Sequence, residues 1–286
     1  MFGFLNVYKP TGKTSHDVVA ILRRVTKVKQ IGHTGTLDPF AEGVLPICIG
    51  KATRLIEYLN DEKAYIGTIQ FGSSTTTYDT EGEVVKTSDK IVTQGDVEES
   101  LKFFRGEIEQ LPPIYSAIKI NGKKLYEYAR AGQEVKIEPR KVTIFELELV
   151  NFNQAAQQAE IRIVCSKGTY IRSIANDLGD KLGALGHLIK LVRIKAGDFY
   201  VDNSIKLEDL NSPEIVIKKL IYPTEKLNFA VYNLNEEEKK KISNGNAITP
   251  NQPFEIDEFV TLMDKEKLAA IAKFDGKFLK CEKVFL

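Results

Sequence analysis

The chain has 286 residues, 43% of them hydrophobic, which suits one large domain with a small one, or two of comparable size. The formal net charge is only +1, so composition alone does not indicate a nucleic-acid binder, and any such function depends on local basic patches. The cysteines and histidines are scattered and lack ligand spacing, which argues against a disulfide framework or a metal site. The sequence has no signal pattern and no apolar run near the roughly 20 residues of a membrane span, so we expect a cytoplasmic protein.

The first expected elements are a strand over residues 3–7 and a helix that Thr14 or Ser15 caps. The apolar side chains of this helix recur with helical spacing at Val18, Ile21, Leu22 and Val25. Between the two elements, Gly-Lys-Thr ends like a P-loop, but that motif needs a glycine at position 7, where the chain has valine. A P-loop NTPase is therefore a weak alternative.

The next feature is a loop, rich in glycine and proline, that presents Asp38. Residues 32–50 contain four glycines and two prolines, which excludes a regular helix, and the apolar run 44–49 is short enough to be a buried strand. Glycines at 32 and 35 would let other groups approach the backbone, and Pro39 disfavours helical backbone at Asp38. A lone aspartate in such a loop is most often a turn former, so the residues alone leave its role open.

The wording of this loop, G-H-T-G-T-L-D-P-x-A-x-G-V-L-P, resembles the active-site motif of the tRNA pseudouridine synthase B family. A second signature of that family, G-x-x-x-x-x-K-P-x-G-x-T-S, begins at Gly3 and supports the catalytic loop there. The resemblance implies that Asp38 is the essential catalytic residue. It places Lys9 among the substrate-binding residues, and His33, beside Asp38 on the loop, is the candidate to fill the space that a flipped-out base leaves.

A short helix is expected over residues 52–60 and a strand over 64–71, in which Tyr65 is one of the alternating large side chains. From its residue type alone, Tyr65 is an ordinary aromatic on a sheet face. The resemblance implies that its ring stacks on the target base, and its hydroxyl is a second candidate, as a general base. Residues 73–82 resemble the family's G-x-x-T-x-T-x-D-x-x-G strand and turn.

A locally basic segment follows, where we expect a strand, an Asn-Gly turn and a short helix. Residues 119–141 contain seven basic and three acidic side chains, a net charge of +4 on a nearly neutral protein. A solvated charged hairpin would look much the same. The family resemblance assigns the segment to an RNA-binding insertion, about residues 115–141, with tyrosines that RNA recognition favours and with these candidate RNA contacts: Lys119, Lys123, Lys124 and Arg130.

After two expected strands, at 142–150 and 159–165, a helix begins near Arg172. The helix dipole disfavours a cation at this end, so Arg172 requires an anion, either a phosphate or a carboxylate. The signature C-S-K-G-T-Y-I-R-S-I-A-x-D-L-G is a long match to the family, and it implies that Arg172 forms a salt bridge with Asp38 that keeps the carboxylate ionised.

Two further residues take their roles from the same resemblance. Tyr170 lies within the signature and is assigned to substrate binding. Leu191, in an expected strand over 186–193, matches the family's apolar residue that packs against the flipped base.

The last sixty residues change character. They predict a strand near Phe229, a helix over 236–243, and short strands joined through an Asp-Gly turn at 275–276. An x-x-G-x-x-I pattern at Gly245 resembles the PUA-like RNA-binding domain of the family, although this match is weaker than those upstream.

Together these features predict an α+β protein, with a mixed-sheet pseudouridine synthase domain over residues 1–226 and a small, mostly β, PUA-like domain over 227–286. The expected activity is isomerisation of a uridine in the T-arm loop of tRNA, position 55 by resemblance, without a cofactor or a metal. By this resemblance, guide-dependent relatives typically lack the inserted segment, so we expect a stand-alone enzyme without guide RNA. We also expect a monomer that does not bind a membrane. The alternative is a tRNA-binding or folding factor without chemistry.

Overall fold

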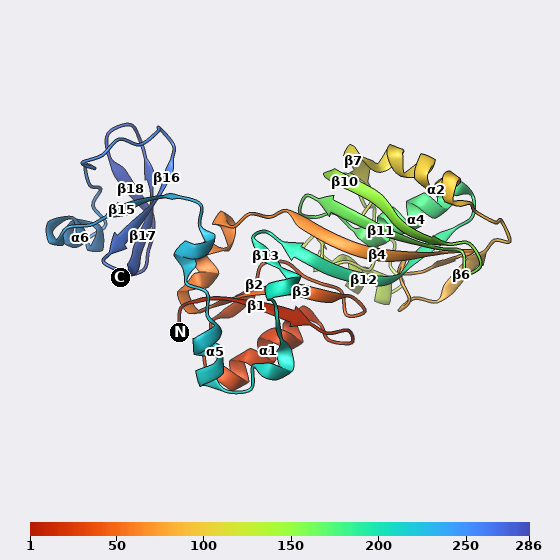
Figure 1. The fold of residues 1–286 in the computed structure, drawn as a ribbon, viewed down its shortest axis with the longest axis horizontal. Helices are drawn as coiled ribbons and strands as arrows, with labels where there is room; N and C mark the ends of the chain where they lie inside the picture. The colour runs from red at the N-terminus through yellow and green to blue at the C-terminus, as the bar shows by residue number, and fades with distance from the viewer.

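A computed structural model of the chain describes residues 1–286 and contains one large mixed β-sheet and a smaller mixed sheet near the C-terminus (Figure 1). In the large sheet the β1–β14 and β3–β12 pairs are parallel and the other neighbours antiparallel. Its strands are, in spatial order, β14 (Ile205–Lys206), β1 (Gly3–Lys9), β3 (Glu42–Ile49), β12 (Gly186–Ala196), β4 (Lys63–Phe71), β11 (Gln158–Cys165), β10 (Arg140–Asn153) and β7 (Gly106–Gln110), with β2 (Ile31–His33) beside β3 and β13 (Phe199–Tyr200) beside β12. The α+β prediction is confirmed.

Six α-helices and five short 3-10 helices accompany the sheets. Figure 1 shows α2 and α4 together at the β10 end of the large sheet and α1 and α5 beside its β1 end. The helices are α1 (Ser15–Thr26), α2 (Gln94–Leu101), α3 (Leu125–Arg130), α4 (Ile171–Leu182), α5 (Pro213–Lys219), α6 (Glu236–Ser243), η1 (Gly50–Tyr58), η2 (Lys102–Phe104), η3 (Val201–Asn203), η4 (Leu207–Asp209) and η5 (Pro223–Lys226). The helix expected over 52–60 is the 3-10 helix η1. No helix of the protein is both long and apolar enough to span a membrane.

Local sequence explains where α1 begins and ends. Thr14 caps its N-terminus: its hydroxyl accepts from the Asp17 backbone N–H, and the Asp17 carboxylate accepts from the Thr14 backbone N–H. Lys27, in the left-handed region with φ of 60°, ends it. Because α1 is fixed at its start, the turn before it is a firm support for the loop that carries Asp38.

The largest apolar core lies between α2, α4 and strands β4, β10, β11 and β12. It contains Tyr65 and Leu191 from the sheet, Ile171 from the start of α4, and Leu37, the residue before Asp38. The candidate site is therefore built on the core of the protein.

One glycine of the Asp38 motif has a clear structural reason. Gly43 begins the buried part of β3 with φ of +109°, and a side-chain Cβ there would lie 2.3 Å from the carbonyl oxygen of Arg193 on the parallel strand β12. Any other residue would push the two strands apart. Gly32 and Gly35, in contrast, have ordinary backbone, and the protein atoms nearest to a Cβ there would lie 3.7 Å away or more, so no part of the protein itself requires these glycines.

The C-terminal sheet has four strands, with α6 beside them: β15 (Ala230–Asn233), β16 (Phe259–Asp264), β17 (Lys267–Phe274) and β18 (Leu279–Val284). It lies at one end of the long axis in Figure 1 and packs on the rest of the protein through an apolar cluster that includes Phe4, Leu55, Ile271 and Phe285. Two smaller hairpins complete the fold: β5 (Ser73–Thr75) with β6 (Val84–Thr87), and β8 (Lys119–Ile120) with β9 (Lys123–Lys124).

Candidate active site

Asp38 lies on the loop between β2 and β3, and both of its chain neighbours are tied to the N-terminal segment. The Ser15 hydroxyl accepts from the backbone N–H of Leu37 at 2.8 Å and donates to the Leu37 carbonyl at 3.1 Å. On the other side, the backbone N–H of Gly12 donates to the carbonyl of Pro39 at 2.8 Å. The second signature therefore contacts the loop directly, as expected, and limits the positions that Asp38 can take.

Lys9 belongs to this support and not to the surface. It is fully buried, and its Nζ donates to the carbonyl oxygens of Pro10, Lys13 and Pro39 at 2.9, 2.6 and 3.3 Å. Burial lowers its pKa to about 8, although the charge of Asp38 opposes that fall. The assignment of Lys9 to substrate binding is wrong for this structure, because three carbonyl oxygens converge on the ammonium group beneath the loop.

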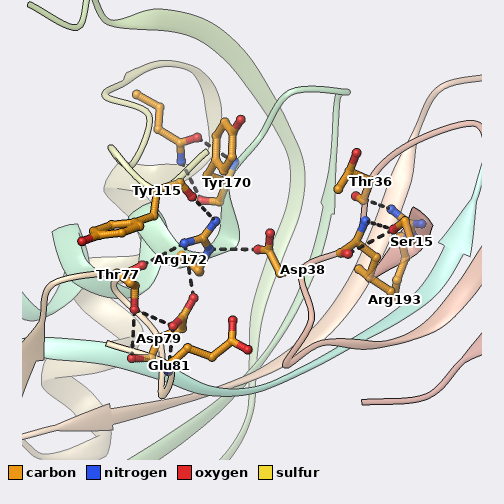
Figure 2. Close-up of polar contacts among 12 residues, drawn as sticks. Ser15, Thr36, Asp38, Thr77, Asp79, Glu81, Tyr115, Tyr170, Arg172 and Arg193 are labelled. Atoms are coloured by element: carbon orange, nitrogen blue, oxygen red, sulfur yellow. Dashed lines mark hydrogen bonds and ion pairs between the residues drawn. The ribbon is translucent and has the colours of Figure 1, made fainter. Parts of the chain in front are cut away.

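Asp38 faces Arg172, whose guanidinium connects four groups (Figure 2). Its Nε lies 2.9 Å from Asp38 Oδ2 and its Nη1 lies 3.2 Å from Asp79 Oδ2. The two Nη atoms also donate to the carbonyls of Thr77 and Tyr115, at 2.9 and 3.0 Å. The side chain of Asp38 is 31% exposed, whereas those of Arg172 and Asp79 are 5% and 2% exposed. The expected Arg172–Asp38 ion pair is present, and only the carboxylate of Asp38 reaches the surface.

The electrostatics of Asp38 are balanced between burial and charge. Burial raises the pKa of this carboxyl, the positive charge of Arg172 opposes the rise, and the nearby Asp79 adds to it. The net direction is upward, so Asp38 is a more basic carboxylate than one in water. Arg172 limits the rise, which keeps the ionised form accessible for chemistry.

Asp79 lies within one of the family motifs, but the sequence alone gives it no role. Its Oδ1 accepts from the Thr77 hydroxyl at 2.6 Å and from the Glu81 backbone N–H at 2.9 Å, and Oδ2 faces Arg172. The signal that could have found it is the cation at the start of α4, which requires an anion. The structure supplies two such anions, the carboxylates of Asp38 and Asp79. No three His, Cys, Asp or Glu side chains gather where they could hold a metal ion.

Tyr65 and Leu191 come from the adjacent antiparallel strands β4 and β12. Tyr65 pairs with Arg193, and Leu191 with Gly67, so the three side chains point to the same face of the sheet. Both Tyr65 and Leu191 are buried in the largest core. Burial raises the pKa of Tyr65, and the positive charge of Arg193 opposes the rise.

Tyr170 lies directly before α4 and is fixed by a single side chain. Gln110 accepts from its backbone N–H at 2.8 Å and donates to its carbonyl at 3.0 Å. Burial raises the pKa of the Tyr170 phenol. The half-buried phenol thus belongs to the same end of α4 as Arg172.

His33 ends β2, where it pairs with Ile47, and it is not on the loop beside Asp38 as we expected. Burial and the charge of Arg193 lower its pKa, which favours the neutral imidazole. The hydrophobic pattern hid this short strand because only three residues form it.

The basic segment forms β8, β9 and α3, as predicted, and its turn has positive φ at Asn121 and Gly122. Lys123 Nζ lies 4.6 Å from the ring centroid of Tyr128, and two other cations lie over the ring of Tyr126: Lys124 at 5.3 Å and Arg130 at 5.4 Å. Lys119 is exposed. Since the Tyr115 carbonyl accepts from Arg172, the insertion is also connected to the Asp38 site.

The mixed sheet and the Asp38 site together are those of a pseudouridine synthase. Two solved structures share this fold, and each match covers the whole of this chain and 85% of the other chain. One is a Cbf5-Nop10-Gar1 complex, with 26% sequence identity and a TM-score of 0.73. The other is an H/ACA RNP bound to a substrate RNA containing 2'-deoxyuridine, with 23% identity and a TM-score of 0.72.

Sequence comparison gives the family. The profile of the TruB family pseudouridylate synthase N-terminal domain matches residues 23–171, and that of the tRNA pseudouridylate synthase B C-terminal domain matches 172–228. Proteins named tRNA pseudouridine synthase B are similar over nearly their full length: one from Caldanaerobacter subterraneus is 42% identical and covers 99% of both chains, and one from Clostridium perfringens is 41% identical and covers 100% of this chain and 99% of its own. This chain belongs to the TruB family, and it is an isomerase.

Proposed function

We propose that this enzyme converts a uridine in the T-arm loop of tRNA, position 55 by resemblance, to pseudouridine, with Asp38 as nucleophile on a base flipped out of its stack. The observation that carries the proposal is the partly exposed Asp38 carboxylate, 2.9 Å from the buried Arg172 guanidinium. The full-length similarity to proteins named tRNA pseudouridine synthase B supports the choice of substrate.

The chemistry needs few groups. The N1–C1′ bond of uridine breaks, the uracil turns, and C5 forms a bond to C1′; C5 then loses a proton and N1 gains one, so the reaction needs no oxidant or reductant. A carboxylate serves the first step either by covalent attack or by assisting loss of the uracil to a glycal-like sugar. In both routes Arg172 opposes protonation of Asp38 and holds its carboxylate in place.

The second step needs a base for the C5 proton. Tyr65 is our candidate, since its side chain is buried in the same core as Leu37, the residue before Asp38. Leu191, beside it on β12, would pack against the flipped base, and Tyr170 and His33 would line the space around it. Flipping costs a few kcal/mol of stacking energy, which the pocket must offset.

Affinity for tRNA would come from other parts of the chain. We assign residues 1–226 to catalysis, the insertion at about 115–141 to the RNA backbone, and residues 227–286 to a PUA-like RNA-binding domain. Lys119, Lys123, Lys124 and Arg130 are the proposed phosphate contacts. The enzyme would act as a monomer, without cofactor or guide RNA.

The test is to incubate the purified protein alone with an unmodified tRNA transcript and to map pseudouridine at nucleotide resolution. We expect modification at the T-loop uridine and none in a transcript with cytidine at that position. Tight tRNA binding without pseudouridine would contradict the proposal and favour an RNA-folding factor.

A further inference from the structure

A buried arginine outside the Asp38–Arg172 pair has no acidic partner. Arg193, on β12, is 1% exposed, and its guanidinium donates to three backbone carbonyls: Nε to Val44 at 2.7 Å, Nη1 to Thr36 at 3.3 Å and Nη2 to Gly35 at 3.1 Å. Figure 2 shows Arg193 beside Thr36. Buried arginines are almost always paired with a charge of opposite sign. Two of these carbonyls belong to the loop that carries Asp38.

The groups around Arg193 make its charge harder to explain by stability alone. Lys9 of β1, Lys63 of β4 and His33 of β2 all lie near enough for Arg193 to lower their pKa values. Burial lowers the pKa of Lys63 to about 8, with Arg193 as the second cause. Several cations therefore surround one loop, and a neutral side chain of similar length in place of Arg193 would remove repulsion.

On the other side, Arg193 faces Tyr65. The two residues pair directly across β12 and β4, so their side chains lie on the same face of the sheet. Burial and the negative charge of Asp38 favour the neutral phenol and raise its pKa, whereas Arg193 favours the ionised form. Arg193 is the cation that favours a phenolate at Tyr65.

We propose that Arg193 is a positioning residue for pseudouridine formation, in which one guanidinium both fixes the backbone before Asp38 and stabilises the phenolate of Tyr65 that removes the C5 proton. This inference rests on the proposed role of Tyr65 as the base. In that step the phenolate oxygen takes the proton and becomes a phenol, and the electron pair of the C–H bond restores the ring double bond. An arginine suits the task because its planar fork reaches several acceptors at once, which an ammonium group cannot do.

The experiment compares Arg193→Lys, Arg193→Gln and Arg193→Met in the full-length protein. Tyrosines carry a carbon label at Cζ for NMR titration, and the signal of Tyr65 among the 11 tyrosines is assigned with Tyr65→Phe. Single-turnover pseudouridine formation is measured across pH in parallel. In the two neutral variants, the titration of Tyr65 and the rise of the rate with pH should both move to higher pH, and the rate at neutral pH should fall by about 10²-fold, as for a misplaced catalytic group.

Arg193→Lys separates the two parts of the role. It keeps the charge, so the midpoints of the Tyr65 titration and of the pH–rate profile should remain near those of the wild type. The rate should fall at every pH, because a lysine cannot donate to all the carbonyls that the guanidinium contacts. Arg162→Gln is the matched control: this half-exposed arginine of β11 pairs with Glu146, and its replacement should change neither rate nor titration.

Two results would overturn the inference. One is a neutral variant that binds tRNA as the wild type does and keeps the wild-type titration and pH profile. The other is Arg193→Lys with the wild-type rate at all pH values, which also decides the matter if the neutral variants fail to fold. A fully active Tyr65→Phe would instead remove the base role from the proposed function, and the titration would still report whether Arg193 acts on the phenol.

Discussion

The cations beside Asp38 and the cations of the β8–β9 hairpin carry the same charge in opposite environments. Arg172 and Arg193 are buried, and their N–H groups donate to backbone carbonyls from distant segments. Lys123 and Lys124 are half-buried at the surface and lie over tyrosine rings. A buried cation that donates to backbone carbonyls fixes geometry, whereas a cation at the surface remains available to a phosphate. Burial and hydrogen bonding, and not charge alone, therefore distinguish the cations proposed to support catalysis from the cations proposed to bind RNA.

The largest expected effect comes from removing the carboxylate of Asp38, which pairs with the buried Arg172. Asp38→Asn should abolish pseudouridine formation and leave the Kd for tRNA within several-fold, because affinity comes from phosphate contacts. The variant should fold, since Arg172 keeps Asp79 and two carbonyl partners. Single-turnover assays and filter binding measure the two quantities, and full activity would remove Asp38 from catalysis.

Thermal unfolding provides a control on the same variant. Because the pKa of Asp38 is raised in the folded state, folding is favoured while this carboxyl is protonated and loses stability as pH rises through that pKa. Asn removes this destabilisation, so the Tm of Asp38→Asn at neutral pH should equal or exceed that of the wild type. A marked fall in Tm would mean that the absence of activity reflects unfolding.

Tyr65→Phe should come next in size. It keeps the ring and removes the hydroxyl, so a base role predicts normal tRNA binding and a decrease in single-turnover rate of about 10²–10⁴-fold. A stacking role predicts a near-normal rate for Phe and a poor one for Tyr65→Leu. A near-normal Phe variant would leave Tyr65 as a stacking platform, and another group would have to take the proton.

A smaller effect tests the electrostatic link to Arg172. Arg172→Met removes the charge that opposes the rise in the pKa of Asp38, so the acid limb of the pH–rate profile should move to higher pH. A rise of about one pKa unit lowers the rate on that limb by about tenfold. Arg172→Lys keeps a charge and should move the limb less. Identical limbs in all three proteins would show that Arg172 does not control the ionisation of Asp38.

The smallest expected effect belongs to the hairpin. With Lys123→Ala and Lys124→Ala together, the slope of log K against log salt should flatten by about 0.7–0.9 for each phosphate that the protein no longer neutralises. The single-turnover rate at saturating tRNA should not change. Lys102→Ala, at an exposed position of η2 directly after α2, is the matched control. An unchanged slope would mean that the hairpin is a solvated charged surface that does not contact the RNA phosphates.

Much of the fold could be predicted because the signals were local. The helix 236–243 and the buried strand after Asp38 follow from capping, periodicity and short apolar runs, and both are confirmed. The Arg172–Asp38 contact was expected from the family motif, and the helix dipole gave it an independent physical reason.

The rest depends on contacts that no local pattern contains. Arg193 and its partner Val44 are 149 residues apart, so the sequence shows only an arginine in a strand. Lys9 is misassigned for the same reason: a lysine is usually exposed, and only the folded loop brings carbonyl oxygens around it. Asp79 is one acidic residue in a polar turn until α4 brings Arg172 beside it.

The most direct test of the division between chemistry and binding is a side-by-side measurement of Kd and single-turnover rate on one unmodified tRNA. We predict that Asp38→Asn loses the rate and keeps the Kd, while the Lys123→Ala, Lys124→Ala double variant weakens the Kd and keeps the rate at saturation. If both variants lose rate and affinity together, the two groups of residues do not have separate tasks, and the proposed division is wrong.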